Sequence, residues 1–159
     1  MEDLRFKKNR KSIKREIMKA IMVIILAILI LVLQSDQIAM VIISTALVIL
    51  ALFLIYNSLK NKNTVIVNKN GILSRTNGMS LIKWEYIESF EIRKAVNAVV
   101  LVVKVNDIDK LLSEMNKISK QLMKSNIKKL GSPVIIPESE FNDSLTNAKD
   151  KIEEYKNSL

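Results

Sequence analysis

Three glutamates recur at three-residue spacing in the middle of the chain: Glu85, Glu88 and Glu91. Paired carboxylates can act as general acid and general base when they share a face and differ in pKa. These three residues lie across the entry of a predicted strand, so they are not expected to share a face. We interpret them as solvated surface residues.

Other residue types that carry chemistry are scarce, because the chain contains no cysteine and no histidine. This composition excludes disulfides, zinc sites of the usual nitrogen and sulfur type, thiol chemistry and imidazole catalysis. Asp107 and Asp109 flank a predicted helix start, where an acid caps the helix more readily than it binds a metal. The three glycines, Gly71, Gly78 and Gly131, are too few for a phosphate-binding loop or a dinucleotide fingerprint. The sequence therefore predicts no enzyme, no cofactor and no metal site.

Two apolar segments dominate the first third of the chain and predict a transmembrane helical hairpin over residues 17–56, with spans of about 17–35 and 38–56. The first span includes Lys19, whose long side chain can reach the interface. A buried helical core and a cleaved signal peptide are the alternatives. The rest of the chain is too small to cover two helices that are apolar on every side, and a second span follows the first at once.

The basic residues predict the orientation of the hairpin. Residues 1–19 hold eight Lys and Arg, whereas the turn from Gln34 to Gln37 holds none and Lys60 follows the second span. The positive-inside rule then places two parts of the chain on the cytoplasmic side of a cell membrane. They are the basic N-terminal segment, residues 1–16, and the C-terminal part. Small residues at seven-residue spacing are expected to let the helices approach closely. They are Ala20, Ala27, Ala39 and Ala46.

The net charge of +9 does not predict nucleic-acid binding. Basic flanks beside anionic lipid account for it, and no aromatic-rich stacking surface accompanies the charge. The lipid bilayer is therefore the expected partner.

Residues 60–159 predict a cytoplasmic α+β domain. Short β-prone runs separated by turns at Gly71 and Gly78 predict a curled antiparallel sheet. A helix follows from Asp107 to Leu130, and the segment after it holds one more strand and a closing helix. The closing helix carries one apolar stripe, formed by Phe141, Leu145, Ala148, Ile152 and Tyr155.

This order of elements, together with the step Ile82-Lys83-Trp84-Glu85-Tyr86-Ile87 into the middle strand, resembles the bacterial pleckstrin-homology-like (PH-like) domain. The whole chain is similar to uncharacterised bacterial proteins in which two membrane helices precede such a domain. The helix from Asp107 to Leu130 is an insertion in that pattern. The resemblance implies a non-enzymatic binding or scaffolding module. Trp84, the only tryptophan, is expected to pack in the core with its indole N–H bonded to backbone.

The candidate binding surface is a lysine stripe on the helix from Asp107 to Leu130, expected opposite an apolar stripe that includes Ile118 and Leu122. Its residues are Lys110, Lys117, Lys120, Lys124 and Lys128. A solvated surface is the plain interpretation, and contact with anionic lipid headgroups or a membrane protein is the functional one. The alternative function is an immunity protein against a membrane-active peptide, in which the hairpin itself meets the attacker.

Overall fold

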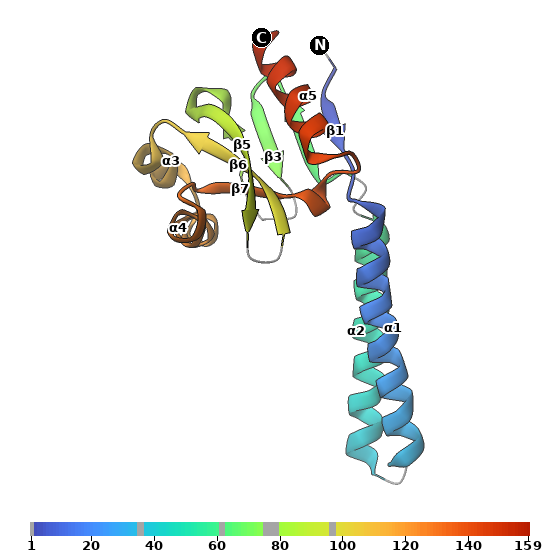
Figure 1. Cartoon of the computed structure of the whole chain (residues 1–159). Coiled ribbons are helices and arrows are strands. Elements are labelled where there is room, and N and C mark those ends of the chain that lie inside the picture. Colours follow the sequence, from blue (N-terminus) through green and yellow to red (C-terminus); the bar gives the residue numbers. More distant parts are fainter. Residues whose placement is uncertain (1, 35–36, 61–62, 75–79, 96–97) are drawn as a thin grey trace. The chain divides into compact units, whose positions relative to one another are not determined.

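A computed structural model describes residues 2–34, 37–60, 63–74, 80–95 and 98–159. The chain divides into two units, Arg10–Lys62 and the combination of Met1–Asn9 with Asn63–Leu159. The first unit is a helical hairpin and the second is a mixed domain of sheets and helices (Figure 1). The domain is therefore built from residues on both sides of the hairpin. The sequence predicts its start at residue 60 and gives no part in it to the N-terminal segment.

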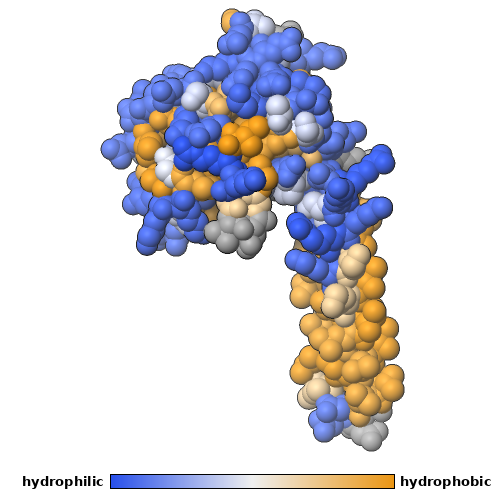
Figure 2. Space-filling view, in the orientation of Figure 1, coloured by the Kyte–Doolittle hydropathy of each residue, from blue (hydrophilic) through white to orange (hydrophobic). Residues whose placement is uncertain are grey.

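The hairpin consists of α1 (Arg10–Leu33) and α2 (Ile38–Lys60). Both helices are long and apolar enough to cross a membrane. At about 1.5 Å per residue each is roughly 35 Å long, which exceeds the roughly 30 Å of a hydrocarbon core. Figure 2 shows the hairpin hydrophobic along most of its length and hydrophilic at its two ends. The two predicted spans are confirmed as helices, and both helices continue beyond the apolar part.

Small residues line the contact between α1 and α2. Ala20 and Ala27 are buried on α1, as predicted. On α2 the buried residues are Ser44 and Ala51, whereas Ala39 and Ala46 are exposed. The expected pair on α2 was wrong because this helix is apolar on every side, so hydropathy does not reveal which face packs.

The first sheet of the domain contains four antiparallel strands in the order β1-β2-β3-β4. They are β1 (Leu4–Phe6), β2 (Val65–Asn68), β3 (Gly71–Ser74) and β4 (Ile82–Lys83). The strand β1, which comes before the hairpin, pairs with β2, which follows it, and Phe6 lies opposite Val65. The backbone N–H of Thr64 donates to the carbonyl of Phe6 at 2.9 Å. The hairpin is thus an insertion between two neighbouring strands.

The second sheet contains three antiparallel strands in the order β5-β6-β7. They are β5 (Ile87–Ala95), β6 (Ala98–Val105) and β7 (Val134–Pro137). The 3-10 turn η1 (Trp84–Tyr86) leads from the first sheet to the second, and η2 (Glu138–Glu140) follows β7. The described strands therefore form two antiparallel sheets and not one closed barrel.

Three helices complete the domain: α3 (Ile108–Glu114) and α4 (Lys117–Leu130) between β6 and β7, and α5 (Leu145–Asn157) at the C-terminus. Figure 1 shows α5 on one side of the sheets and the pair α3 and α4 on the other. All five residues of the predicted stripe are buried, and four of them lie on α5: Leu145, Ala148, Ile152 and Tyr155. The prediction was wrong for Phe141, which precedes α5 and follows η2 in an extended conformation.

One core joins the two sheets and α5. Its largest fully buried side chains include Ile72, Ile82, Leu101, Ile136 and Phe141. Phe6 is 4% exposed and lies edge to face with Phe141, at 5.1 Å between ring centroids. The short strand before the hairpin thus contributes an aromatic side chain to the centre of the domain.

Gly71 has a structural role, as the sequence suggests. It begins β3 at a φ of +148°, where side chains are rarely found. A Cβ atom at this position would lie 2.0 Å from the backbone oxygen of Ile82 in β4. Only glycine therefore lets β4 approach β3 here. Gly78, the second predicted turn glycine, lies outside the described residues.

The contribution of β1 to the core predicts a loss of stability in Phe6→Ala. Removal of a buried phenyl ring costs about 3 to 5 kcal/mol. Urea unfolding of the full chain in detergent, followed by the fluorescence of the single Trp84, should show this loss. The control is Arg5→Ala on the same strand, where an exposed side chain should change stability by less than about 0.5 kcal/mol. Equal midpoints for the two variants would show that β1 is not part of the folded domain.

Candidate functional site

The lysine stripe predicted from Asp107 to Leu130 lies on two helices, because the structure breaks the predicted helix at Met115 and Asn116. Met115 adopts an extended conformation, and the side chain of Asn116 caps α4 by accepting from the backbone N–H of Ser119 at 2.8 Å. An asparagine at such a position starts a new helix. Apolar residues keep a helical spacing across residues 115 and 116, so the sequence pattern does not reveal the break between the two helices.

The break separates the predicted lysines into two groups. Lys110 lies on α3, with its Nζ 5.6 Å from the ring centroid of Tyr86. The other four, Lys117, Lys120, Lys124 and Lys128, share α4. Lys117, Lys124 and Lys128 are exposed, Lys120 is half-buried, and Lys129 is an exposed addition that the prediction did not include.

The buried face of α4 differs from the predicted one. The sequence places Ile118 and Leu122 toward the sheet, but they are 74% and 43% exposed. Ser119 and Met123 are fully buried in their place. The reason is again the cap at Asn116, because a helix that restarts at residue 117 need not continue the angular phase of α3. The outer side of α4 therefore combines lysines with two exposed apolar side chains.

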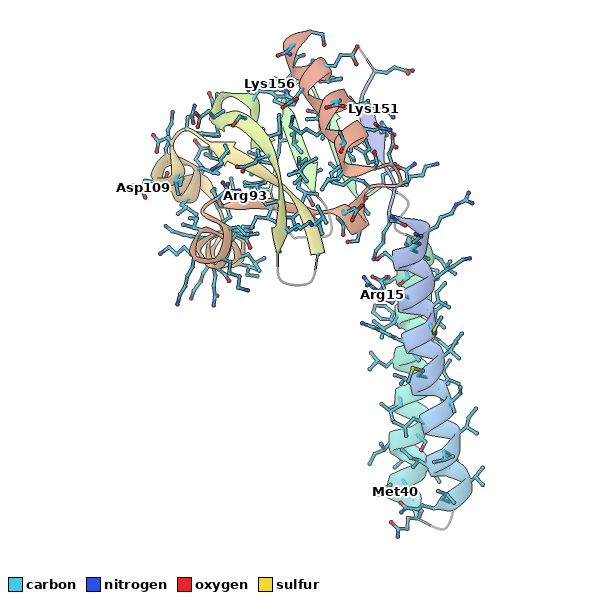
Figure 3. The ribbon with its side chains drawn as sticks, viewed as in Figure 1. Arg15, Met40, Arg93, Asp109, Lys151 and Lys156 are labelled. Atoms are coloured by element: carbon cyan, nitrogen blue, oxygen red, sulfur yellow. The ribbon has the colours of Figure 1, made fainter. Side chains whose placement is uncertain are left out.

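The C-terminal end of α4 is fixed to the sheet by hydrogen bonds. The guanidinium of Arg93 on β5 donates to the carbonyl of Leu130 at 2.9 Å (Figure 3). The side-chain amide of Asn126 donates to the carbonyl of Pro133 at 3.0 Å. Gly131 ends the helix in the left-handed conformation, with φ at 73°, and its N–H donates to Ile127. These contacts give the outer face of α4 a defined direction relative to the sheets.

Arg93 also belongs to an ion-pair network on the second sheet, on the face against which Leu130 packs. Its Nη2 lies 2.7 Å from a carboxylate oxygen of Glu91, and the Nζ of Lys104 lies 3.6 Å from the same oxygen. The hydrogen bond from Arg93 lowers the pKa of Glu91, and the charge of Lys104 adds to this. Glu91 is therefore an ionised partner of Arg93 at neutral pH.

A second polar cluster fixes α3 to η1. The Tyr86 hydroxyl donates a hydrogen bond to the Glu114 carboxylate. The Nζ of Lys83 lies 3.5 Å from Glu114 and 3.3 Å from Glu85. The bond to Glu114 raises the pKa of Tyr86 to about 12, with desolvation adding to it, and the same bond lowers the pKa of Glu114. At neutral pH the hydroxyl keeps its proton and the carboxylate stays charged, so this hydrogen bond ties α3 to η1.

The three glutamates singled out by the sequence stay apart. Glu85 on η1 forms an ion pair with Lys83 of β4, and Glu91 forms one with Arg93, both on β5. Glu88 is exposed. Within the described residues, no group of three or more acidic, histidine or cysteine side chains lies close enough to hold a metal ion. The geometry of these carboxylates gives no acid and base pair.

Trp84 packs against the core but is only half-buried. Its indole N–H donates to the carbonyl of Asn68 at 2.9 Å, which confirms the predicted bond to backbone. Its ring stacks on Tyr155 of α5, with 6.3 Å between centroids. The tryptophan thus ties η1 to the β2–β3 turn and to the C-terminal helix.

The Tyr86 hydrogen bond predicts a titration that depends on Glu114. In Glu114→Gln the pKa of Tyr86 should fall from about 12 toward the ordinary value of about 10, because the charged acceptor is gone. Phenolate absorbance measures this pKa when the curve of a Tyr86→Phe variant is subtracted. An unchanged midpoint in Glu114→Gln would contradict the assignment.

The same bond predicts the pH range in which the cluster stabilises the fold. The folded pKa of Tyr86 is raised, so this contribution is present below the unfolded pKa and is lost as pH rises through the folded one. The folded pKa of Glu114 is lowered, so its contribution is lost as pH falls through that value.

The arrangement of two sheets, a pair of inserted helices and a C-terminal helix has been compared with known proteins. None of the protein-family models, the curated proteins or the solved structures matches the chain. The resemblance to PH-like domains consequently depends on the order of elements and on the step through Trp84. It belongs with the proposal that follows.

Proposed function

We propose that this chain is a non-enzymatic binding module, tethered by two spans to a bacterial cell membrane, with a PH-like domain at the cytoplasmic face. The observation that carries the proposal is the pairing of β1 with β2 across the hairpin. If α1 and α2 both cross a bilayer, a sheet that contains residues from before and after them has to lie on one side of it. An even number of membrane crossings between β1 and β2, here two, brings the chain back to the same side. An odd number would leave the two strands on opposite sides.

The distribution of charge supports the cytoplasmic side. The first turns of α1 carry basic residues, α2 ends at Lys60, and the sequence between Gln34 and Gln37 contains no Lys or Arg. Cytoplasmic flanks of membrane helices hold such an excess of positive charge. The basic residues of α1 are Arg10, Lys11, Lys14, Arg15 and Lys19.

The order of elements supports a PH-like domain. Antiparallel strands followed by a C-terminal helix that packs on the core agree with the order on which the resemblance depends. In this interpretation the hairpin occupies the connection from β1 to β2, and α3 and α4 occupy the connection from β6 to β7. A fold alone does not determine a function, so the binding role depends on the exposed surface.

The polar groups support binding over catalysis. Glu85, Glu91 and Glu114 are each engaged in an ion pair, and Glu114 also accepts the hydrogen bond from Tyr86 that joins α3 to η1. The outer side of α4 instead offers exposed lysines that none of these contacts uses. We assign partner contact to this side of α4.

The proposed function predicts that α4 contacts a membrane component in cells. A photo-crosslinking amino acid at Gln121, an exposed position among the α4 lysines, should give adducts in native membranes. The same amino acid at Asn157, exposed on α5, is the control and should give few. Equal yields at both positions would contradict a binding role for α4.

Sidedness is tested separately with reporters. A reporter inserted between Gln34 and Gln37 should be active outside the cell, and one fused after Leu159 should be active in the cytoplasm. A cytoplasmic signal from the first insertion would contradict two complete crossings.

A further inference from the structure

Ile118 and Leu122 form an exposed apolar pair on α4. They are 74% and 43% exposed and lie one helical turn apart, so their side chains are neighbours. Isolated apolar residues on a surface are common and need no explanation. This pair is distinctive because of the charges that share its helix.

The helix that carries the pair also carries five lysines, and it contains no acidic residue. At about 100° per residue, the exposed positions of α4 occupy an arc of about 160°, with Ile118 and Leu122 on one side of it. Among the residues that the structure describes, no ion pair involves an α4 lysine. The lysines of the helix are Lys117, Lys120, Lys124, Lys128 and Lys129. Every charge on this face is therefore positive, and one side of the face is apolar.

Packing and helix electrostatics do not account for this face. Lys117 occupies the first position of α4, where the positive end of the helix dipole disfavours a cation. The first turn contains no acid that would offset it. Ile118, at the second position, gains little burial in the domain. Stability alone would place other residues at both positions.

We propose that α4 docks on the surface of an anionic bilayer, an inference that rests on the proposed membrane anchor. Ile118 and Leu122 enter the headgroup region, and the lysines contact anionic lipid phosphates while their aliphatic stems lie along the interface. Amphipathic helices that lie in membrane interfaces combine the same two kinds of residue.

The position of α4 in the domain suits this docking. The bonds from Arg93 and Asn126 hold the helix to the sheet, so the exposed face keeps its direction. Figure 3 shows side chains of α4 projecting away from the sheets.

Other occupants fit this face less well. A second copy of the chain would bring two lysine faces together, and their repulsion opposes such a dimer. A single-stranded nucleic acid would find no aromatic side chain on α4 for base stacking. An anionic bilayer satisfies both the charge and the apolar pair.

The experiment uses the full chain in liposomes and a single environment-sensitive fluorophore. The chain contains no cysteine, so Ile118→Cys provides one labelling site. In liposomes that contain phosphatidylglycerol, lipids with a nitroxide near the glycerol should quench most of the fluorescence. In liposomes of phosphatidylcholine alone the quenching should be lost. High salt should weaken it, because screening removes long-range attraction to the surface.

Two sets of variants make the test specific. Lys124→Gln with Lys128→Gln should reduce quenching at position 118, whereas Lys69→Gln with Lys94→Gln, an equal change in charge at exposed positions off α4, should not. A label at Asn157→Cys on α5 should stay unquenched in both kinds of liposome.

A label at Leu29→Cys in α1 separates this inference from the proposed function. Quenching at position 29 in both kinds of liposome, with none at position 118 in either, would overturn the docking of α4 and leave the anchor intact. No quenching at position 29 would contradict the anchor itself. Self-quenching at position 118 that grows with protein density would overturn the inference in favour of a second copy.

Discussion

The backbone pairing of β1 with β2 is the constraint on which the rest of the structure depends. Three residues before the hairpin, Leu4 to Phe6, complete a sheet whose other strands follow it. Their backbone groups need partners, and Phe6 needs the apolar surroundings that Phe141 provides. The helical hairpin is therefore a long connection between two adjacent strands, and the domain and the hairpin fold as connected parts of one topology.

In each unit, a hydrogen bond joins the two chain segments that lead to the other unit. In the domain, the end of β1 and the start of β2 are joined by the hydrogen bond from Thr64 to Phe6. In the hairpin, the beginning of α1 and the end of α2 are joined by the bond from the Ser58 hydroxyl to the Glu16 carboxylate, at 2.8 Å. Because the helices bring their own ends together, closing the sheet around them costs little additional chain entropy.

The sequence predicted those elements whose signal is local and failed where a signal was short or ambiguous. The two apolar helices and the buried stripe of α5 follow from long apolar patterns, and the structure contains both. The strand β1 was missed because a three-residue alternation, Leu4-x-Phe6, is hidden in a basic segment. The break before α4 was missed because apolar spacing continues through Asn116, although its capping side chain was a usable signal. The exposed apolar pair of the candidate site depends on that break, so the sequence placed Ile118 in the core.

The most direct test of the central claim is a disulfide across the β1–β2 pair in native membranes. Arg5 lies opposite Ile66, and facing positions in antiparallel strands are close enough for two cysteines to bond. In the cysteine-free chain, Arg5→Cys with Ile66→Cys should form the bond on mild oxidation. Arg5→Cys with Leu73→Cys should not, because β3 lies one strand further away. Absence of the 5–66 bond, or equal bonding of both pairs, would contradict a domain closed by the strand before the hairpin.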